Sequence, residues 1–142
     1  MICPVGVYPP RKSFLVKIIV LSLLGNWGLN RIKRLVFYNA ALSEDAEEFF
    51  MLTNKHFRFR TGAPPLFSDE ELLSLTMPVL FLAGENDAFL NTPKTVKRLQ
   101  KLVPNLTVNL MKDDGHAAIN MAPNVIPFLK TDIAVNEAVI TS

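Results

Sequence analysis

The stretch "PVLFLAGEND", residues 78–87, decides the fold. Its apolar run is continuous and is bounded by Pro78 and Gly84, and such a run predicts a strand buried on both faces, as in a parallel sheet. Gly84 allows the chain to turn where the strand ends, and Asp87 follows three positions later. We therefore expect Asp87 at the carboxyl edge of a parallel sheet.

The same pattern recurs downstream, where "NLTVNLM" (105–111) predicts a second strand and His116 follows it. Between the strands, "TPKTVKRLQKLVP" (92–104) predicts a helix with Pro93 at its first position. The order strand, helix, strand implies a right-handed crossover between parallel strands. Asp87 and His116 therefore follow neighbouring strands, which lie about 4.8 Å apart in a sheet.

An acid beside a histidine at this edge suggests catalysis, because functional groups collect beyond the carboxyl ends of parallel strands. The Asp87 carboxylate on one ring nitrogen of His116 would fix the tautomer and leave the other nitrogen as a general base. Structural alternatives stay open at this point. Asp87 also suits a turn or a helix N-cap, and His116 also suits a turn.

The first part of the chain predicts helices after a short strand. "MICPVGVYPP" (1–10) predicts the end of a strand followed by a proline-rich loop. Beyond it we expect a largely buried helix over 14–24 and a break at "GNWGLN" (25–30). A second helix is expected over 31–38, with Asn30 as its N-cap.

Two serines predict further helix starts. Ser43 and Ser68 each precede acidic residues, which the helix dipole favours in a first turn. The third helix is expected to point three apolar residues inward, Phe49, Phe50 and Leu52. A final helix is expected within 116–133, disturbed by Pro123 and Pro127.

Composition favours one globular domain. The 142 residues are 49% hydrophobic, and the net charge is only +2. The one dense basic group, residues 31–34, is better explained by a solvated helix face, so no nucleic-acid partner is expected. The apolar part of residues 11–24 is too short to span a bilayer, which needs about 20 apolar residues. The single cysteine, Cys3, is expected to be a buried, unreactive thiol and fits a cytoplasmic location.

These motifs resemble the C-terminal half of the α/β-hydrolase superfamily, in its carboxylesterase-like and lipase-like branch. The acid of that family follows a G-x-x-D pattern, here Gly84 to Asp87, and its histidine follows a G-H pattern, here Gly115-His116. The resemblance implies a partial α/β-hydrolase fold, a short parallel sheet of two or three strands flanked by helices, plus a helical cap. Residues 1–77 would hold the strand stub and cap, and residues 78–142 the core.

The nucleophile motif of that family is missing from this sequence. No G-x-S-x-G occurs, and no serine sits on a strand-turn-helix elbow with flanking glycines. The serines are Ser13, Ser22, Ser43, Ser68, Ser74 and Ser142. The resemblance therefore implies the C-terminal portion of a serine hydrolase for an ester with a hydrophobic acyl group, with Asp87 as triad acid and His116 as base. Without nucleophile and oxyanion hole, the isolated chain is expected to be inactive.

Other function classes remain in view. A non-enzymatic α/β interaction module would oligomerise through its exposed sheet edge. A nucleotide-binding domain is disfavoured, because this sequence lacks the Gly-rich phosphate-binding loop of such domains. The expected partners are a small ester and either a second copy of the chain or a separate N-terminal half. No cofactor and no metal are expected, because adjacent residues such as Asp113 and Asp114 seldom converge on one ion. His56 is expected to be solvated. Trp27 and the phenylalanines of the cap are expected to pack in the core, and the alternative is that they line an acyl pocket.

Overall fold

The sheet has two fully formed parallel strands. The computed structural model describes residues 1–38, 41–57, 65–117 and 121–140, the last nine by their backbone alone. Strand β1 (Val79–Gly84) pairs in parallel with β2 (Leu106–Met111). Helix α5 (Thr92–Leu102) connects them, with proline in its first turn. The strand-helix-strand unit predicted from the sequence is therefore confirmed.

Strand β1 lies in the middle of the sheet because residues near the start of the chain pair with its other edge. Ile2 forms a parallel bridge with Leu82. The backbone N–H of Leu82 donates to the carbonyl of Met1 at 2.9 Å, and that of Cys3 donates to the carbonyl of Leu82 at 2.8 Å. The predicted strand stub is thus present as a single bridge, and Cys3 comes directly after it.

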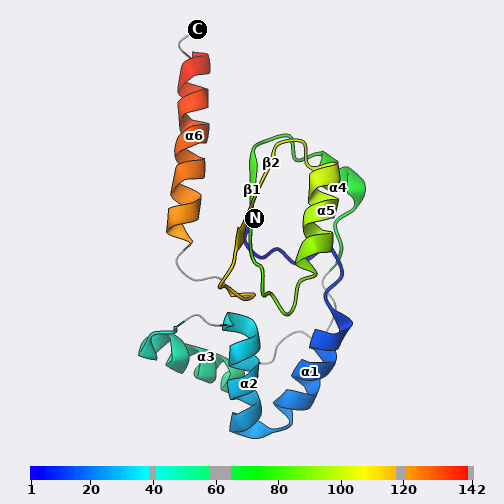
Figure 1. The fold of residues 1–142 in the computed structure, drawn as a ribbon, viewed down its shortest axis with the longest axis vertical. Helices are drawn as coiled ribbons and strands as arrows, with labels where there is room; N and C mark the ends of the chain where they lie inside the picture. The colour runs from blue at the N-terminus through cyan, green and yellow to red at the C-terminus, as the bar shows by residue number, and fades with distance from the viewer. Residues whose placement is uncertain (39–40, 58–64, 118–120, 141–142) are drawn as a thin grey trace.

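Every residue of β1 is buried, as the continuous apolar run predicts. Successive side chains of a strand point to opposite faces. On one face, Val79, Phe81 and Ala83 join Leu99 and Leu102 of α5 in the hydrophobic core. On the other face, Leu80 and Leu82 line a shallow cleft together with residues of α6 (Ala122–Ile140). The two helices lie on opposite sides of the sheet (Figure 1).

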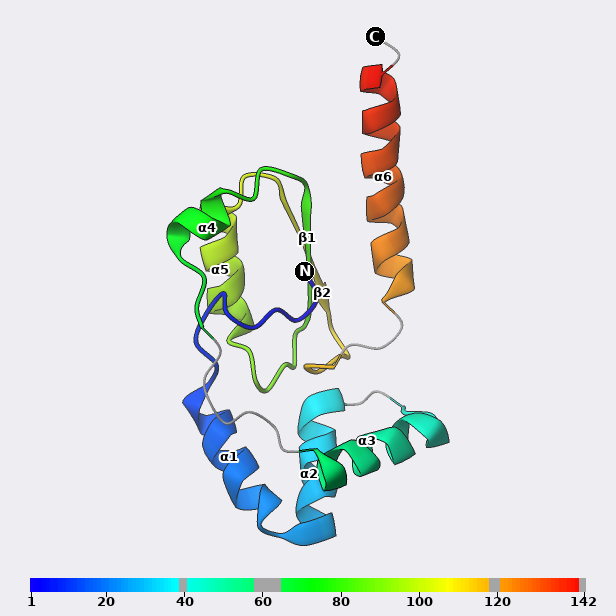
Figure 2. The ribbon, with the colours of Figure 1, turned by 180° about the vertical axis from the view of Figure 1, so that it is seen from behind.

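Three helices lie beyond the carboxyl ends of the strands, as Figures 1 and 2 show. They are α1 (Lys12–Ser22), α2 (Gly25–Phe37) and α3 (Glu44–His56), and we call them together the helical segment. Ser43 accepts a hydrogen bond from Ala46 N at 3.3 Å, which confirms it as the N-cap of α3. Within the described residues, no helix is long and apolar enough to cross a membrane.

The predicted break at residues 25–30 is wrong, because α2 already begins at Gly25 and runs through this stretch. The turn between α1 and α2 instead ends at Gly25, whose φ of 57° is in the left-handed region that glycine tolerates. Gly28 lies inside the helix, where a Cβ would come within 1.8 Å of the Leu21 carbonyl oxygen. The glycines therefore allow α1 and α2 to approach closely rather than interrupting α2.

Burial in the helical segment is also lower than the sequence predicts. In α1 only Phe14 is buried, and Ile19 is 63% exposed. In α3, Phe49 is 71% exposed and Leu52 is half-exposed, whereas Phe50 packs edge-on against Phe37. The prediction that Phe49 and Leu52 point inward is therefore wrong, because nothing among the described residues covers them.

The final helix is less disturbed than predicted. Helix α6 is continuous from Ala122 to Ile140 with Pro127 inside it. The Thr131 hydroxyl donates to the Pro127 carbonyl at 3.0 Å, so this oxygen has a partner within the helix. Residues 118–120, which the sequence analysis placed at the start of this helix, lie outside the described residues.

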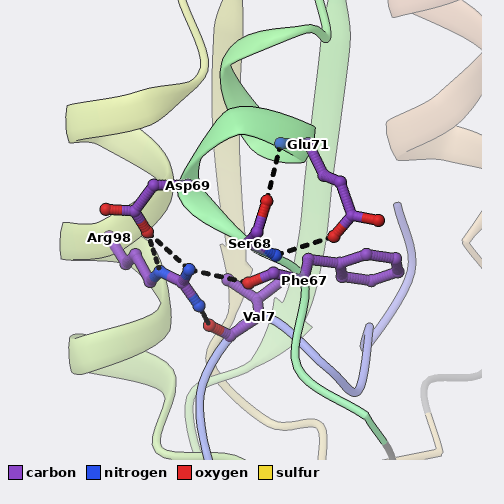
Figure 3. A network of polar contacts seen from close by, with 6 residues as sticks. All are labelled: Val7, Phe67, Ser68, Asp69, Glu71 and Arg98. Atoms are coloured by element: carbon purple, nitrogen blue, oxygen red, sulfur yellow. Dashed lines mark hydrogen bonds and ion pairs between the residues drawn. The ribbon is translucent and has the colours of Figure 1, made fainter.

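A polar network fastens the opening loop to the core (Figure 3). The Arg98 guanidinium on α5 donates to the carbonyls of Val7 and Phe67 and to the Asp69 carboxylate, the last two at 2.8 and 2.6 Å. Ser68 and Glu71 form a capping box at the start of α4 (Asp69–Leu73), as the sequence predicts. Because Asp69 is exposed, its ion pair with Arg98 is expected to add little stability. The network thereby holds the segment that follows Cys3 against the sheet.

Candidate functional site

Asp87 is held in place by the turn that follows β1. One carboxylate oxygen, Oδ1, accepts hydrogen bonds from the backbone N–H groups of Phe89 and Leu90 at 2.7 and 2.8 Å. This is the local hydrogen-bonding pattern by which aspartate stabilises turns. Asp87 is only 1% exposed, so its side chain is fixed within the protein rather than by water. Asp87 therefore has the structural role of a turn residue, which was one of the alternatives open from the sequence.

The second carboxylate oxygen of Asp87 contacts His116. Its Oδ2 lies 2.8 Å from His116 Nδ1. The Asp87 side chain is fully buried, whereas that of His116 is 27% exposed. One carboxylate thus stabilises a turn with Oδ1 and orients an imidazole with Oδ2. With Nδ1 facing the acid, Nε2 is the nitrogen left for a reacting group.

The loop that carries His116 is held from two sides. The backbone N–H of Ala117 donates to the carbonyl of Val36 at the end of α2 at 3.0 Å, and Tyr38 forms a bridge with Asp114. On the strand side, the Asn86 amide donates to the carbonyl of Lys112 at 2.5 Å. The end of α2 and the turn after β1 therefore fix the position of the imidazole together.

Both glycines of the two motifs are required for space. A Cβ on Gly84 would come within 2.2 Å of the Asp114 carbonyl oxygen, and one on Gly115 within 2.5 Å of the Val36 carbonyl oxygen. Gly84 does not have a positive φ. The prediction that Gly84 serves to let the chain turn is therefore wrong. Its role is to let the histidine loop pass directly over the end of β1.

Aromatic rings connect His116 to the helical segment. The Phe89 ring lies edge-on to the imidazole at a centroid distance of 4.9 Å, and Phe14 of α1 lies edge-on to Phe89 at 5.2 Å. Phe14 also lines an apolar cleft of about 870 Å³ between α1, α2 and α3. Neither Phe89 nor Phe14 was predicted as a site residue, because contacts between loop and helix aromatics leave no periodic signal in the sequence.

Cys3 lies beside the acid and the histidine. One potential metal-binding atom from each of Cys3, Asp87 and His116 lies within 4.8 Å of the other two. Cys3 is only partly buried, so the expectation of a buried, unreactive thiol is wrong in its first part. The sequence held a signal for this position. Cys3 follows a strand end, as Asp87 and His116 do.

The other candidate residues lie apart from this site. His56 is exposed at the end of α3, as predicted. Trp27 is 58% exposed and stacks with Arg31, so its predicted core position is wrong. Among the described residues, Asp113 and Asp114 belong to no group suited to a metal. The five described serines lie on α1 or at the ends of α3 and α4, and none of them hydrogen-bonds His116.

Sequence comparison relates this chain to carboxylesterases of Bacillus subtilis (strain 168). It is 36% identical to carboxylesterase YbfK over 55 residues, which is 39% of this chain and 19% of YbfK. It is 31% identical to the uncharacterized carboxylesterase nap over 65 residues, 46% of this chain and 22% of that protein. No protein-family model matches the chain.

Structural comparison decides the fold. The crystal structure of carboxylesterase CesB (YbfK) from Bacillus subtilis aligns with 94% of this chain, at a TM-score of 0.63 and 17% sequence identity. The crystal structure of a putative hydrolase from Bacillus subtilis aligns with 95% of this chain, at a TM-score of 0.68 and 19% sequence identity. The chain carries part of an α/β-hydrolase fold. It is related in sequence to carboxylesterases of this fold.

This chain is shorter than its relatives. It spans 48% of the CesB structure and 48% of the putative hydrolase. The crystal structure of naproxen esterase from Bacillus subtilis aligns with 76% of this chain, at a TM-score of 0.62 and 22% sequence identity. The alignment covers 40% of the naproxen esterase chain. The chain thus spans about half the length of the solved relatives that it matches.

Proposed function

We propose that this chain is the C-terminal portion of a serine carboxylesterase, in which Asp87 is the triad acid and His116 the general base. The observation that carries the proposal is the contact of 2.8 Å between Asp87 Oδ2 and His116 Nδ1 beyond the ends of parallel strands. The relation to carboxylesterases supports an ester as the substrate. The acid precedes the histidine along the chain, which is the order of acid and base in α/β-hydrolases.

His116 would act on a serine supplied from outside these 142 residues. In the first half-reaction, His116 Nε2 takes the serine proton as the hydroxyl oxygen attacks the ester carbonyl, and then passes it to the departing alkoxide. In the second, it takes a proton from the water that attacks the acyl-enzyme and returns it to the serine. Asp87 stabilises the imidazolium that forms in each half-reaction.

The place for the missing part is the edge of the sheet formed by Ile2. Because Ile2 already pairs with β1 in parallel, further parallel strands can extend the sheet beyond it. We therefore propose that this chain associates with an N-terminal half of the fold, on the same or a separate polypeptide. The half would bring the nucleophile elbow to the edge that carries Cys3, next to His116.

The helical segment would form a cap that binds the apolar part of the ester. Its cleft is lined by apolar residues of all three helices, and Phe14 and Phe89 connect the cleft to the imidazole by direct ring contacts. An acyl group of apolar or aromatic character would bury its surface there. A cytoplasmic location remains the expectation from the single cysteine.

Labelling with a fluorophosphonate probe tests the proposed division of the active site. The isolated chain is expected to show no labelling by mass spectrometry, because none of its described serines contacts His116. The coding sequence upstream of Met1 is expected to contain an in-frame G-x-S-x-G, and the protein that includes it should be labelled at that serine. Stoichiometric labelling of one of the six serines of the isolated chain would show that the nucleophile is already present.

The same experiment distinguishes the proposed enzyme from a non-enzymatic interaction module. The exposed apolar face of α1 is the observation that favours such a module, because large exposed patches usually mark contacts. A module without enzymatic function predicts no upstream G-x-S-x-G and no labelling of the longer protein. A denatured sample of the longer protein is the control, since only a folded site activates its serine toward the probe.

A further inference from the structure

Three residues with different metal-binding groups meet at the candidate site. They are a thiol (Cys3), a carboxylate (Asp87) and an imidazole (His116), and one ligand atom of each lies within 4.8 Å of the other two. They come from the ends of three neighbouring parallel segments, so the sheet itself brings them together. Among the described residues, this is the one group of three or more such side chains that could hold an ion.

We propose that Cys3, Asp87 and His116 form a binding site for a divalent transition-metal ion, with Zn²⁺ as the best match. Sulfur, nitrogen and oxygen ligands together are the set that Zn²⁺ takes in proteins. Ligand atoms about 2.0–2.3 Å from a zinc ion in tetrahedral geometry lie about 3.5 Å apart. Ligand atoms as far apart as 4.8 Å would close by about 1.3 Å. Asp87 Oδ2 and His116 Nδ1, which lie 2.8 Å apart, would open by about 0.7 Å, and side-chain rotations can supply shifts of this size.

The hydrogen bonds of Asp87 leave the right oxygen available. Oδ1 is committed to the backbone N–H groups of Phe89 and Leu90, whereas Oδ2 faces His116. An ion bound by Oδ2 and an imidazole nitrogen would therefore take the place of the contact between Asp87 and His116. The turn after β1 would keep both of its hydrogen bonds to the carboxylate.

Charge and exposure also suit the ion. A thiolate and a carboxylate together balance a 2+ charge, so the bound site would carry no net charge into a largely buried position. The His116 side chain is 27% exposed, which leaves the ion a path from solvent and a fourth position for water. These features distinguish the group from acidic residues on a surface.

The backbone of Cys3 adds a further observation. Its φ of 40° is in the left-handed region, which is unfavourable for a residue with a side chain. Its N–H still donates to the carbonyl of Leu82, so the strand pairing holds the residue in this conformation. Strain of this kind persists where the surrounding structure imposes it, and it is concentrated at functional sites.

Metal binding would regulate the proposed reaction. An ion that occupies the lone pair of His116 and the Oδ2 of Asp87 prevents the imidazole from accepting a proton, so the esterase would be inhibited by Zn²⁺. This consequence rests on the proposed function, whereas the binding itself does not. The two claims can therefore fail separately.

Titration of the isolated chain with Co²⁺, in a reducing buffer without chelator, tests the site. Co²⁺ replaces Zn²⁺ in such sites and gives an absorption band from thiolate to cobalt. We expect one equivalent to produce the band and an excess of Zn²⁺ to abolish it. Cys3→Ser should lose the band, and His116→Gln should weaken binding at least about tenfold. His56→Gln is the matched control, because this exposed histidine lies outside the group, and it should bind like the wild type.

Two outcomes would overturn the proposal. One is the absence of the thiolate band at one equivalent of Co²⁺. The other is an equally strong band in His116→Gln, which would show adventitious binding by the thiol alone. Because a variant can misfold, the wild-type chain gives a second measurement. Zn²⁺ should shift the nitrogen-15 resonances of His116 and leave those of His56 unchanged, and equal shifts of both rings would contradict the site. Neither measurement depends on ester hydrolysis.

Discussion

Replacing His116 by alanine, in the longer protein that includes the proposed nucleophilic serine, is expected to lower kcat/KM for an aryl ester by about 10⁴-fold or more. Without the imidazole, no group is positioned to take the serine proton. Asp87→Asn is expected to cost about 10³–10⁴-fold. The asparagine oxygen can still accept the N–H groups of Phe89 and Leu90, but its NH₂ group would face Nδ1 and favour the wrong tautomer.

The histidine at the end of α3 provides the control for both variants. His56 is exposed and lies in the helical segment, so His56→Ala should leave kcat/KM within about twofold, since surface substitutions seldom matter. The measurement is the initial rate of p-nitrophenyl ester hydrolysis, with circular dichroism to check that each variant is folded. A folded Asp87→Asn variant with wild-type kcat/KM would remove Asp87 from the proposed triad.

Gly84→Ala is expected to destabilise the chain by about 3 kcal/mol or more. The new Cβ would meet the carbonyl oxygens of Asp114 and Gly115 at 2.2 and 2.3 Å. Both obstacles are backbone atoms, so no side chain can rotate away to make room. The histidine loop or the end of β1 must shift, and the contact between Asp87 and His116 would be lost with it. Urea denaturation measures the change in the free energy of unfolding.

The matched substitution is Gly25→Ala at the turn between α1 and α2. Its φ of 57° is unfavourable for alanine, but nothing lies within 4 Å of the added Cβ. The expected cost is therefore the conformational term alone, about 1–2 kcal/mol. If Gly84→Ala were no more destabilising than Gly25→Ala, the close approach of the histidine loop to β1 would not be a constraint on the fold.

The sequence was sufficient for the core of the fold, and the reason is physical. Strand β1 is buried on both faces, so its residues are uniformly apolar and easy to recognise. Proline at the start of α5 and the serine N-caps of α3 and α4 act within one helical turn, so they too are visible locally. The same locality placed Asp87 and His116 after their strands, where the structure brings them together. Their catalytic role stays a prediction.

Long-range packing was not readable in the same way. Gly28 looked like a helix breaker, and only the approach of α1 explains why glycine lies inside α2. The exposure of Phe49 depends on what covers α3, which no pattern within α3 reveals. Cys3 joins the site through a single bridge between Ile2 and Leu82, a pairing that spans most of the sequence. Each of these errors comes from a contact between distant segments.

The central claim, that Asp87 orients His116 as a base, is tested most directly by nitrogen-15 NMR of the isolated chain with labelled histidines and without metal. The chain has two histidines, so exposed His56 serves as an internal reference and His56→Gln assigns the signals. The neutral His116 ring is expected to carry its proton on Nδ1, facing Asp87, and Asp87→Asn should move it to Nε2. A His116 ring with the same tautomer mixture as His56, unchanged in Asp87→Asn, would contradict the account.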